Sequence, residues 1–237
     1  MTANGTAIVE LVEVTKLYRQ GAIEVAALRG LTLSVEPGEF TAICGPSGSG
    51  KTTTLNLIGA LDRPTSGSVA IEGRDLAPLS RKQLSRLRRD RIGFVFQAYN
   101  LMPVLTAYEN AEIVLSLQGV DAAERRERVM KLLADVGLEG LERRRPDELS
   151  GGQQQRVAIA RAIASDPAVV LADEPTANVD SDTADHLLDL MEQLNRERGA
   201  TFIFSTHDPK VMERARRVIR IVDGRVERDD TKAQASA

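Results

Sequence analysis

Mixed polar and apolar positions dominate the first part of the chain. Residues 8–14 (IVELVEV) alternate in this way, which predicts a half-buried strand. Residues 25–35 (VAALRGLTLSV) predict a further pair of strands, ended by a turn at Pro37 and Gly38, and residues 68–72 predict another strand. Strands that are polar on one face are typical of antiparallel sheets, so we expect an antiparallel β subdomain here.

Continuous apolar runs predict a second type of strand, buried on both faces as in a parallel sheet. Four of them are spread along the chain: residues 40–44, 92–96, 168–172 and 201–205. Residues 218–222 and 225–226 predict a closing hairpin about Asp223 and Gly224.

Helical periodicity is found in residues 81–89, 106–136 and 182–198, and a further helix is expected from the glycine pair at Gly151 to Ala164. The segment 106–136 interrupts the strands, so we interpret it as part of an inserted helical subdomain. Together the patterns predict an α/β fold with a mostly parallel sheet.

Residues 40–57 (FTAICGPSGSGKTTTLNL) pass from an apolar strand through a glycine-rich turn into a helix. Gly45, Gly50, Lys51 and Thr52 match the spacing of a phosphate-binding loop. Backbone N–H groups of such a loop and the helix N-terminus surround an anion, Lys51 adds a full charge, and the Thr52 hydroxyl suits Mg²⁺. The alternative, a strand-to-helix turn that only needs glycine, does not explain Lys and Thr at this offset. We therefore expect a nucleoside triphosphate here, contacted also by the rest of the loop: Pro46, Ser47, Gly48 and Ser49.

Composition limits the possible settings. The 237 residues are 42% hydrophobic and 27% charged with a net charge of −3, which is typical of a globular protein and does not indicate nucleic-acid binding. The basic helix at residues 81–89 is more simply a solvated face. The single cysteine, Cys44, excludes an internal disulfide and is expected to be a buried thiol. No apolar run is long enough for a membrane helix and no signal peptide is evident, so we expect a cytoplasmic chain.

A second half of the phosphate site is predicted at the end of the apolar run 168–172, which leads into Asp173 and Glu174. Asp173 can hold Mg²⁺ directly or through water, and Glu174 can polarise the water that attacks the γ-phosphate. Two acids at a strand end are common by chance, but here they follow a phosphate loop in the same chain.

Gln97 and His207 also follow apolar strands, and the carboxyl ends of parallel strands meet at a ligand crevice. Gln97 can bridge the metal and the attacking water, and His207 can hydrogen-bond the γ-phosphate. A structural role is the alternative for each. His186, the other histidine, lies within a predicted helix and is the weaker candidate.

Residues 149–156 (LSGGQQQR) open a helix at Ser150, Gly151 and Gly152, which creates a second anion-binding N-terminus. One triphosphate does not need two such sites in one chain. We infer that this site, with Gln153, serves a nucleotide held by another chain.

These motifs, together with Tyr18 and the turn at Asn178, Val179 and Asp180, resemble the ATP-binding subunit of ABC transporters over residues 6–226. The resemblance implies a P-loop NTPase core and a head-to-tail homodimer with two ATP and Mg²⁺ at the interface. It also implies that Tyr18 stacks on adenine and that Thr53 adds a phosphate contact. From the sequence alone, Tyr18 lies in a loop and is either a base-stacking residue or a rim residue packed on the sheet. Gln97, Glu174 and His207 would act on the γ-phosphate side, and Asp180 would connect the two sites.

The segments GALDRPTSGSVAIEG, IGFVFQAYNLMPVLTAYEN and ELSGGQQQRVAIARAI are similar to the macrolide-export and lipoprotein-release ATPases. This implies an integral membrane permease-type partner, which residues 99–110 would face with their apolar side chains, on the cytoplasmic side of the membrane. The expected domain spans residues 6–228, with a core of 6–96 and 165–228, a helical subdomain of about 98–164 and a frayed tail of 229–237. A turn that reads Ala177, Asn178, Val179, Asp180 departs from the usual Gly-Asn-Leu-Asp but keeps the aspartate.

Two alternatives stay open. One is a soluble ATPase of the same type that acts on nucleic acid or ribosomes, although such relatives usually carry two cassettes or coiled-coil insertions. The other is a regulatory module that binds ATP without hydrolysis, against which Glu174 argues.

Overall fold

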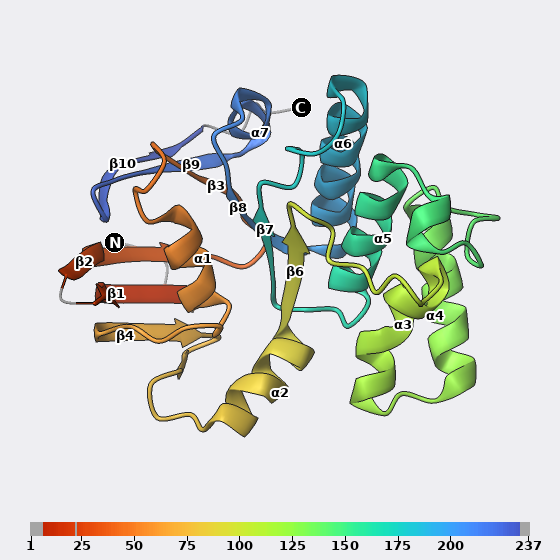
Figure 1. Cartoon of the computed structure of the whole chain (residues 1–237), viewed down its shortest axis with the longest axis horizontal. Coiled ribbons are helices and arrows are strands. Elements are labelled where there is room, and N and C mark those ends of the chain that lie inside the picture. Colours follow the sequence, from red (N-terminus) through yellow and green to blue (C-terminus); the bar gives the residue numbers. More distant parts are fainter. Residues whose placement is uncertain (1–6, 22, 233–237) are drawn as a thin grey trace.

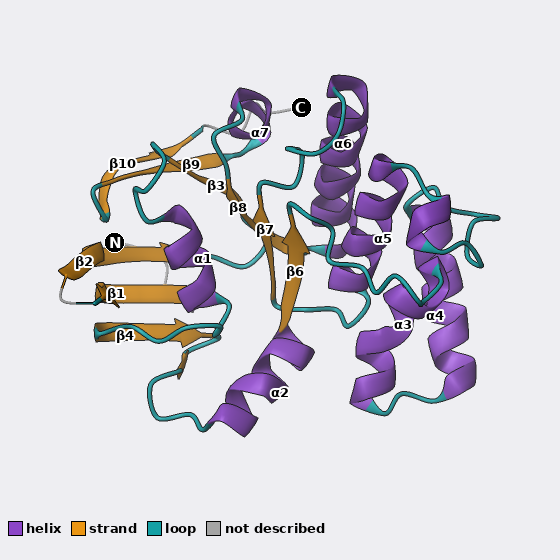
Figure 2. Cartoon of the chain, in the orientation of Figure 1, coloured by secondary structure: helices purple, strands orange, loops and turns teal. Residues whose placement is uncertain are grey.

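The computed structural model describes residues 7–21 and 23–232, and these form two sheets and a group of helices (Figure 1). The antiparallel sheet has the strand order β2-β1-β4-β5, and the larger sheet has the order β10-β9-β3-β8-β7-β6. Figure 2 shows the strands of the small sheet on one side, the larger sheet in the middle and helices α3, α4 and α5 on the other side. The fold is α/β, as the sequence predicts.

The small sheet is built on two long strands, β1 (Val9–Gln20) and β2 (Ile23–Val35), with β4 (Ser66–Ile71) and β5 (Arg74–Asp75) beside them. β1 and β2 pair from Val9 with Val35 to Gln20 with Ile23. The prediction of a strand pair in residues 25–35 is therefore wrong, because β2 is one strand supported along its length by β1. Tyr18 lies within β1 opposite Val25 and not in a loop, which corrects a second expectation.

The larger sheet is parallel from β9 through β3, β8 and β7 to β6, and only β10 runs antiparallel at one edge. Its strands are β3 (Phe40–Cys44), β6 (Ile92–Phe96), β7 (Val169–Asp173), β8 (Thr201–Ser205), β9 (Arg217–Val222) and β10 (Arg225–Thr231). Phe96, Asp173 and Ser205 form one row across three neighbouring strands. The residues that follow this row therefore emerge together at one edge of the sheet.

The helices carry clear end signals. The expected helical stretch 106–136 is two helices, α3 (Ala107–Gln118) and α4 (Ala122–Asp135), because Gly119 ends α3 in a left-handed conformation. Capping boxes start α2 (Arg81–Arg91), α3 and α5 (Gly151–Ile163). The remaining helices are α1 (Lys51–Ile58), the 3₁₀ turn Pro146–Glu148, α6 (Ser181–Arg198) and α7 (Pro209–Arg214).

Two groups of buried side chains form the core. One lies between the parallel sheet and the helices, and includes the mutually packed rings of Phe40, Phe202 and Phe204. The other joins the two sheets through α1, whose Leu55, Leu57 and Ile58 are buried in it. Helix α1 thus sits where the two sheets meet, and the loop before it is held from both sides.

Two further expectations concern the tail and the cysteine. Residues 229–231, expected to fray, belong to β10 and pair with β9, while residue 6 and residues 233–237 lie outside the described part of the chain. Cys44 is buried as predicted, and burial raises the pKa of its thiol. In the described ranges, the helices are all too short or too polar to cross a bilayer.

Candidate nucleotide-binding site

An open groove of about 680 Å³ lies at the carboxyl edge of the parallel sheet. Residues from several separate stretches of the chain line it, and most of them are residues that the sequence singles out. They are Tyr18, Ala27, Gly45, Pro46, Ser47, Gly48, Gly50, Lys51, Thr52, Thr53, Gln97, Glu174, Ser205 and His207. Ala27 and Ser205 are additions, since neither carries a motif by itself.

The glycines of the loop are required by its surroundings. A Cβ at Gly45 would lie 2.0 Å from the Ile221 carbonyl oxygen, and one at Gly50 would lie 2.7 Å from the Ala27 carbonyl oxygen. Both residues also have positive φ, +148° and +106°. Neighbouring strands therefore press the loop into its shape, and only glycine fits at these two points.

The start of α1 faces the groove with a concentration of positive charge. The Lys51 ammonium donates to the carbonyls of Gly45 (2.8 Å) and Pro46 (3.1 Å), which holds it across the loop. Gly50 precedes the helix and has no side chain to cap the first N–H groups of α1. Free N–H donors, a helix N-terminus and a lysine together suit phosphate. The Ser49 side chain is the exception among the loop residues, since it is buried and does not line the groove.

Asp173 ends β7 beside the loop. Burial raises the pKa of Asp173, and the neighbouring charge of Glu174 raises it further, while the nearby hydroxyls of Ser205 and Thr52 and the charge of Lys51 lower it. The carboxylate is therefore a neighbour of the Thr52 hydroxyl. A hydroxyl and a carboxylate side by side are the hard oxygen donors that Mg²⁺ prefers, so this pair fits the metal predicted from the sequence.

Glu174 is held in a defined position. Its φ is +47°, and its amide donates to the Ser205 carbonyl (2.9 Å). The Thr206 hydroxyl donates to one carboxylate oxygen (3.2 Å), and Nδ1 of His207 lies 2.6 Å from the other. The carboxylate is only 17% exposed, whereas the His207 ring is 77% exposed. Thr206 is a positioning residue that the sequence reasoning missed, although it stands between the strand and His207.

The backbone of Gln97 is tied to distant parts of the chain. The Asn178 side chain donates to the Gln97 carbonyl (2.9 Å), and the Tyr99 hydroxyl donates to the Asn178 carbonyl (2.9 Å). Arg161 of α5 donates to the carbonyls of Tyr99 (2.9 Å) and Asn100 (2.6 Å). The segment after β6 is therefore connected to α5 and to the turn before α6.

The second predicted anion site lies apart from the groove. Ser150 caps α5 by accepting a hydrogen bond from the Gln153 amide. Gly152 packs so closely on Thr183 that a Cβ there would clash with it. Asp180 accepts hydrogen bonds from the amide and hydroxyl of Thr183 at the start of α6. These hydrogen bonds lower the pKa of Asp180. Within the described structure, Ser150, Gly151, Gly152, Gln153 and Asp180 are absent from the groove lining. The chain thus does not bring together the two sites that the sequence predicts for phosphate.

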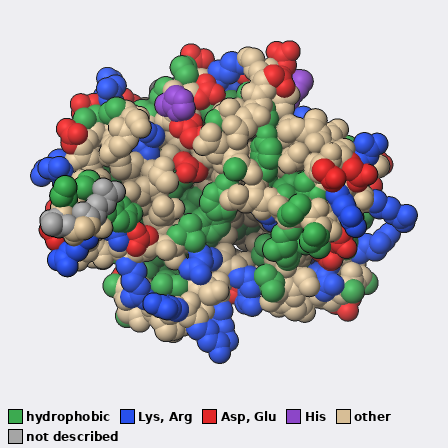
Figure 3. Space-filling view, viewed as in Figure 1, with side chains coloured by type: hydrophobic (Ala, Val, Ile, Leu, Met, Phe, Trp, Pro, Cys, Tyr) green, Lys and Arg blue, Asp and Glu red, His purple; other side chains and the backbone are tan. Residues whose placement is uncertain are grey.

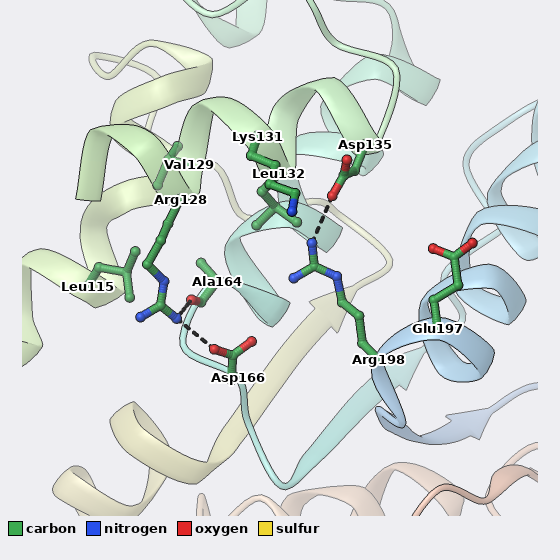
Figure 4. Close-up of a pocket in the computed structure, with 10 residues that line it drawn as sticks. All are labelled: Leu115, Arg128, Val129, Lys131, Leu132, Asp135, Ala164, Asp166, Glu197 and Arg198. Atoms are coloured by element: carbon green, nitrogen blue, oxygen red, sulfur yellow. Dashed lines mark hydrogen bonds and ion pairs between the residues drawn. The ribbon is translucent and has the colours of Figure 1, made fainter. Parts of the chain in front are cut away.

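A further cavity of about 500 Å³ lies between α4, the end of α5 and the end of α6 (Figure 4). Its arginines are paired: Arg128 with Asp166 (2.7 Å) and Arg198 with Asp135 (2.8 Å). Figure 4 shows these pairs bridging the cavity, so they link α4 to the rest of the fold. With opposite charges already matched there, the groove at the phosphate loop is the better candidate for a functional site.

Comparison with known proteins identifies the family of the chain. The ABC transporter family model matches residues 28–177, more than half of the chain. The chain belongs to the ABC transporter family. It is an ATPase cassette, and the relatives give no support to the alternative of an ATPase acting on nucleic acid or ribosomes.

Three similar proteins illustrate the sequence and structural similarity. The lipoprotein-releasing system ATP-binding protein LolD of Anaeromyxobacter dehalogenans is 48% identical over 98% of both chains. The macrolide export ATP-binding/permease protein MacB of Hyphomonas neptunium is 49% identical over 97% of this chain but only 36% of its own length. A dimeric post-hydrolysis structure of the ATP-binding cassette MJ0796 with ADP and Pi is 45% identical, with a TM-score of 0.87 and coverage of 95% and 99%.

The position of Glu174 predicts its effect on turnover. Glu174→Gln keeps the size of the side chain but removes the base, so ATP hydrolysis should slow by roughly 10²–10⁴-fold. ATP binding should persist, because the phosphate loop is unchanged. Phosphate release and nucleotide binding measured side by side test this, with the exposed carboxylate Glu213→Gln as the control. Unchanged turnover in Glu174→Gln would refute the role of this residue.

Proposed function

We propose that the cassette closes head-to-tail with a second copy around two ATP molecules and uses hydrolysis to drive an integral membrane partner. The observation that carries this proposal is the separation of the two phosphate-type sites, one in the groove and the other at the start of α5. A second copy in the opposite orientation can present its Ser150, Gly151 and Gln153 to the nucleotide in the first. The similar cassette MJ0796 forms a dimer bound to ADP and Pi, which supports a nucleotide-bound dimer of this chain.

Most residues of the groove have a role in this proposal. The amides of the loop from Gly45 to Gly50 and the Lys51 ammonium bind the β- and γ-phosphates, Thr53 adds a contact, and Tyr18 stacks on the base. Thr52, Asp173 and Gln97 would hold Mg²⁺, which when bound would neutralise charge that develops on the phosphate oxygens.

Hydrolysis depends on the Glu174 carboxylate, which contacts with Thr206 and His207 hold in place. The Thr206 hydroxyl orients the Glu174 carboxylate, and this carboxylate accepts a proton from the attacking water. His207, exposed and next to Glu174, is free to turn toward the γ-phosphate when the nucleotide is bound. Asp180, bound to Thr183 at the start of α6, ends the turn after Glu174, and Thr183 lies next to Gly152 of α5. In this position Asp180 can pass changes between the two sites.

Closure is a population shift with a simple cause. The γ-phosphate contributes contacts to both subunits in the closed dimer and to only one in the open state. Its removal by hydrolysis therefore favours opening. The cycle of association and dissociation is the movement that the membrane partner would use.

The role of Ser150 gives a matched pair of variants. Ser150→Asp keeps a good helix cap but places a negative charge against the phosphates of the other subunit, whereas Ser150→Thr keeps a neutral cap. In the Glu174→Gln background, ATP should produce a dimer with Thr at this position and leave the Asp variant monomeric. Sedimentation velocity with and without ATP measures this. Dimerisation of the Asp variant at the ATP concentration that closes the Thr variant would contradict the proposed interface.

A partner surface is suggested on another face. A mostly apolar groove of about 380 Å³ lies between α2, β6 and α3, and includes Leu61, Phe94, Leu117 and the cations Arg88 and Arg89. Figure 3 shows hydrophobic side chains around a hollow in the middle of this face, with Lys and Arg side chains below it.

The segment expected to face the partner lies beside that groove. Met102 and Val104 are exposed, Val104 by 73%, while Leu101 and Leu105 are half-buried, so only part of the expected apolar segment is free. The names of the LolD and MacB relatives, a releasing system and an ATP-binding/permease protein, support a membrane permease as the occupant. We place the cassette on the cytoplasmic side of this partner.

Val104 offers a direct test of this partner. Because Cys44 is buried, Val104→Cys introduces a single accessible thiol. A thiol crosslinker applied to cells should join it to an integral membrane protein that sediments with the membranes. The same cysteine at exposed Glu139, away from the groove, is the control. Adducts with ribosomal or other soluble proteins alone would overturn the proposed partner.

A further inference from the structure

Tyr18, at the edge of the groove, is fastened at its hydroxyl. The phenol donates to one carboxylate oxygen of Asp62 (3.0 Å), and the Lys16 ammonium donates to the other (2.7 Å). Lys16 also donates to the Arg63 carbonyl (2.8 Å) and lies 4.9 Å from the centre of the Tyr18 ring. A lysine, a carboxylate and the aromatic ring therefore form one connected cluster, here called the Tyr18 clamp (Lys16, Tyr18 and Asp62).

Asp62 connects this clamp to the phosphate helix. Its amide and that of Leu61 donate to the Asn56 carbonyl in the last turns of α1. The opposite end of α1 carries Lys51 and Thr52. An eight-residue helix is a rigid spacer of about 12 Å, so the clamp fixes the Tyr18 ring relative to the phosphate loop.

The protonation states suit the clamp. Burial opposes ionisation of Asp62, yet hydrogen bonds from Lys16, the Arg63 amide and Tyr18 hold the pKa of its carboxyl below the usual range. Burial raises the pKa of the Tyr18 phenol, against an opposing hydrogen bond with Thr53. Asp62 is therefore an anion and Tyr18 a hydroxyl donor at neutral pH.

We propose that Lys16 and Asp62 are positioning residues for the nucleotide base. This rests on the proposed function, in which Tyr18 stacks on adenine. The Lys16 ammonium covers one side of the ring, so the base stacks on the side that lines the groove, and the Asp62 hydrogen bond stops the ring from turning away. The clamp lowers the entropy that stacking has to overcome. It acts on the base and leaves phosphate recognition unchanged.

Inorganic tripolyphosphate separates these two parts of the ligand, because it has the phosphates and no base. Asp62→Ala should weaken ATP binding by about tenfold, as expected for loss of a charge-assisted hydrogen bond and the order it imposes. Its affinity for tripolyphosphate should stay within about twofold of the original chain, and the Michaelis constant for ATP should rise with little change in turnover number. Calorimetry and a phosphate-release assay measure the two effects.

A double-mutant cycle tests that Asp62 acts through Tyr18. Tyr18→Phe should weaken ATP binding as Asp62→Ala does, and the pair together should be no worse than either one, because both remove the same hydrogen bond. Tyr18→Trp provides a ring that needs no hydroxyl, so Asp62→Ala should have little effect in that background. Asp62→Asn keeps an acceptor and loses the charge, so it serves as a second variant if Asp62→Ala folds poorly. Its ATP affinity should lie between those of the original chain and Asp62→Ala.

Glu24→Ala is the matched control, since the exposed pair of Arg19 with Glu24 lies on the same hairpin and does not touch the ring. Additive losses in the cycle, or equal losses for ATP and tripolyphosphate, would overturn the clamp. If the original chain, without any substitution, bound tripolyphosphate but not ATP, the proposed function itself would be refuted.

Discussion

The phosphate loop is held by backbone contacts from both sheets, and this constraint decides the geometry of everything around it. Gly45 approaches the Ile221 carbonyl of β9, and Gly50 approaches the Ala27 carbonyl of β2. The Gly224 amide, in the turn between β9 and β10, donates to the Ser49 carbonyl (3.0 Å). The loop is therefore a junction of the two sheets. Tight packing of backbone against backbone gives no room to relax, so a ligand meets a preformed set of donors.

The parallel sheet supplies the chemical groups in matching positions. Because Phe96, Asp173 and Ser205 share one row, the residues that follow them reach the same edge: Gln97, Glu174 and Thr206. The antiparallel sheet supplies Tyr18, and the helices keep Ser150 and Gly151 apart from this edge. In the proposed function, these residues would supply a base platform, phosphate donors, two side chains for one metal ion and a general base, but one wall of the site is missing. In the proposed dimer a second copy provides that wall, so ATP joins two subunits and hydrolysis separates them.

Local patterns in the sequence predict much of this arrangement. β3, β6 and β8 coincide with the apolar runs expected for them, and the spacing of the phosphate-loop residues is enough to identify the groove. What depends on long-range pairing is less predictable. Irregular register in β1 between Leu11 and Leu17 breaks the alternation, so residues up to Tyr18 resemble a polar loop although β2 extends the strand. The clamp on Tyr18 joins residues 44 and 46 positions apart, and no local pattern records it.

The central claim is that each nucleotide site is shared between two chains, and a mixing experiment tests it most directly. A Lys51→Ala chain cannot bind ATP at its own phosphate loop. A Ser150→Asp chain has an intact phosphate loop but cannot complete the nucleotide site of its partner. Each variant alone should be inactive. Mixed, they should form heterodimers with one intact site, and hydrolysis should return to about a quarter of the original rate if pairing is random. A mixture that neither hydrolyses ATP nor associates in its presence would contradict the shared site.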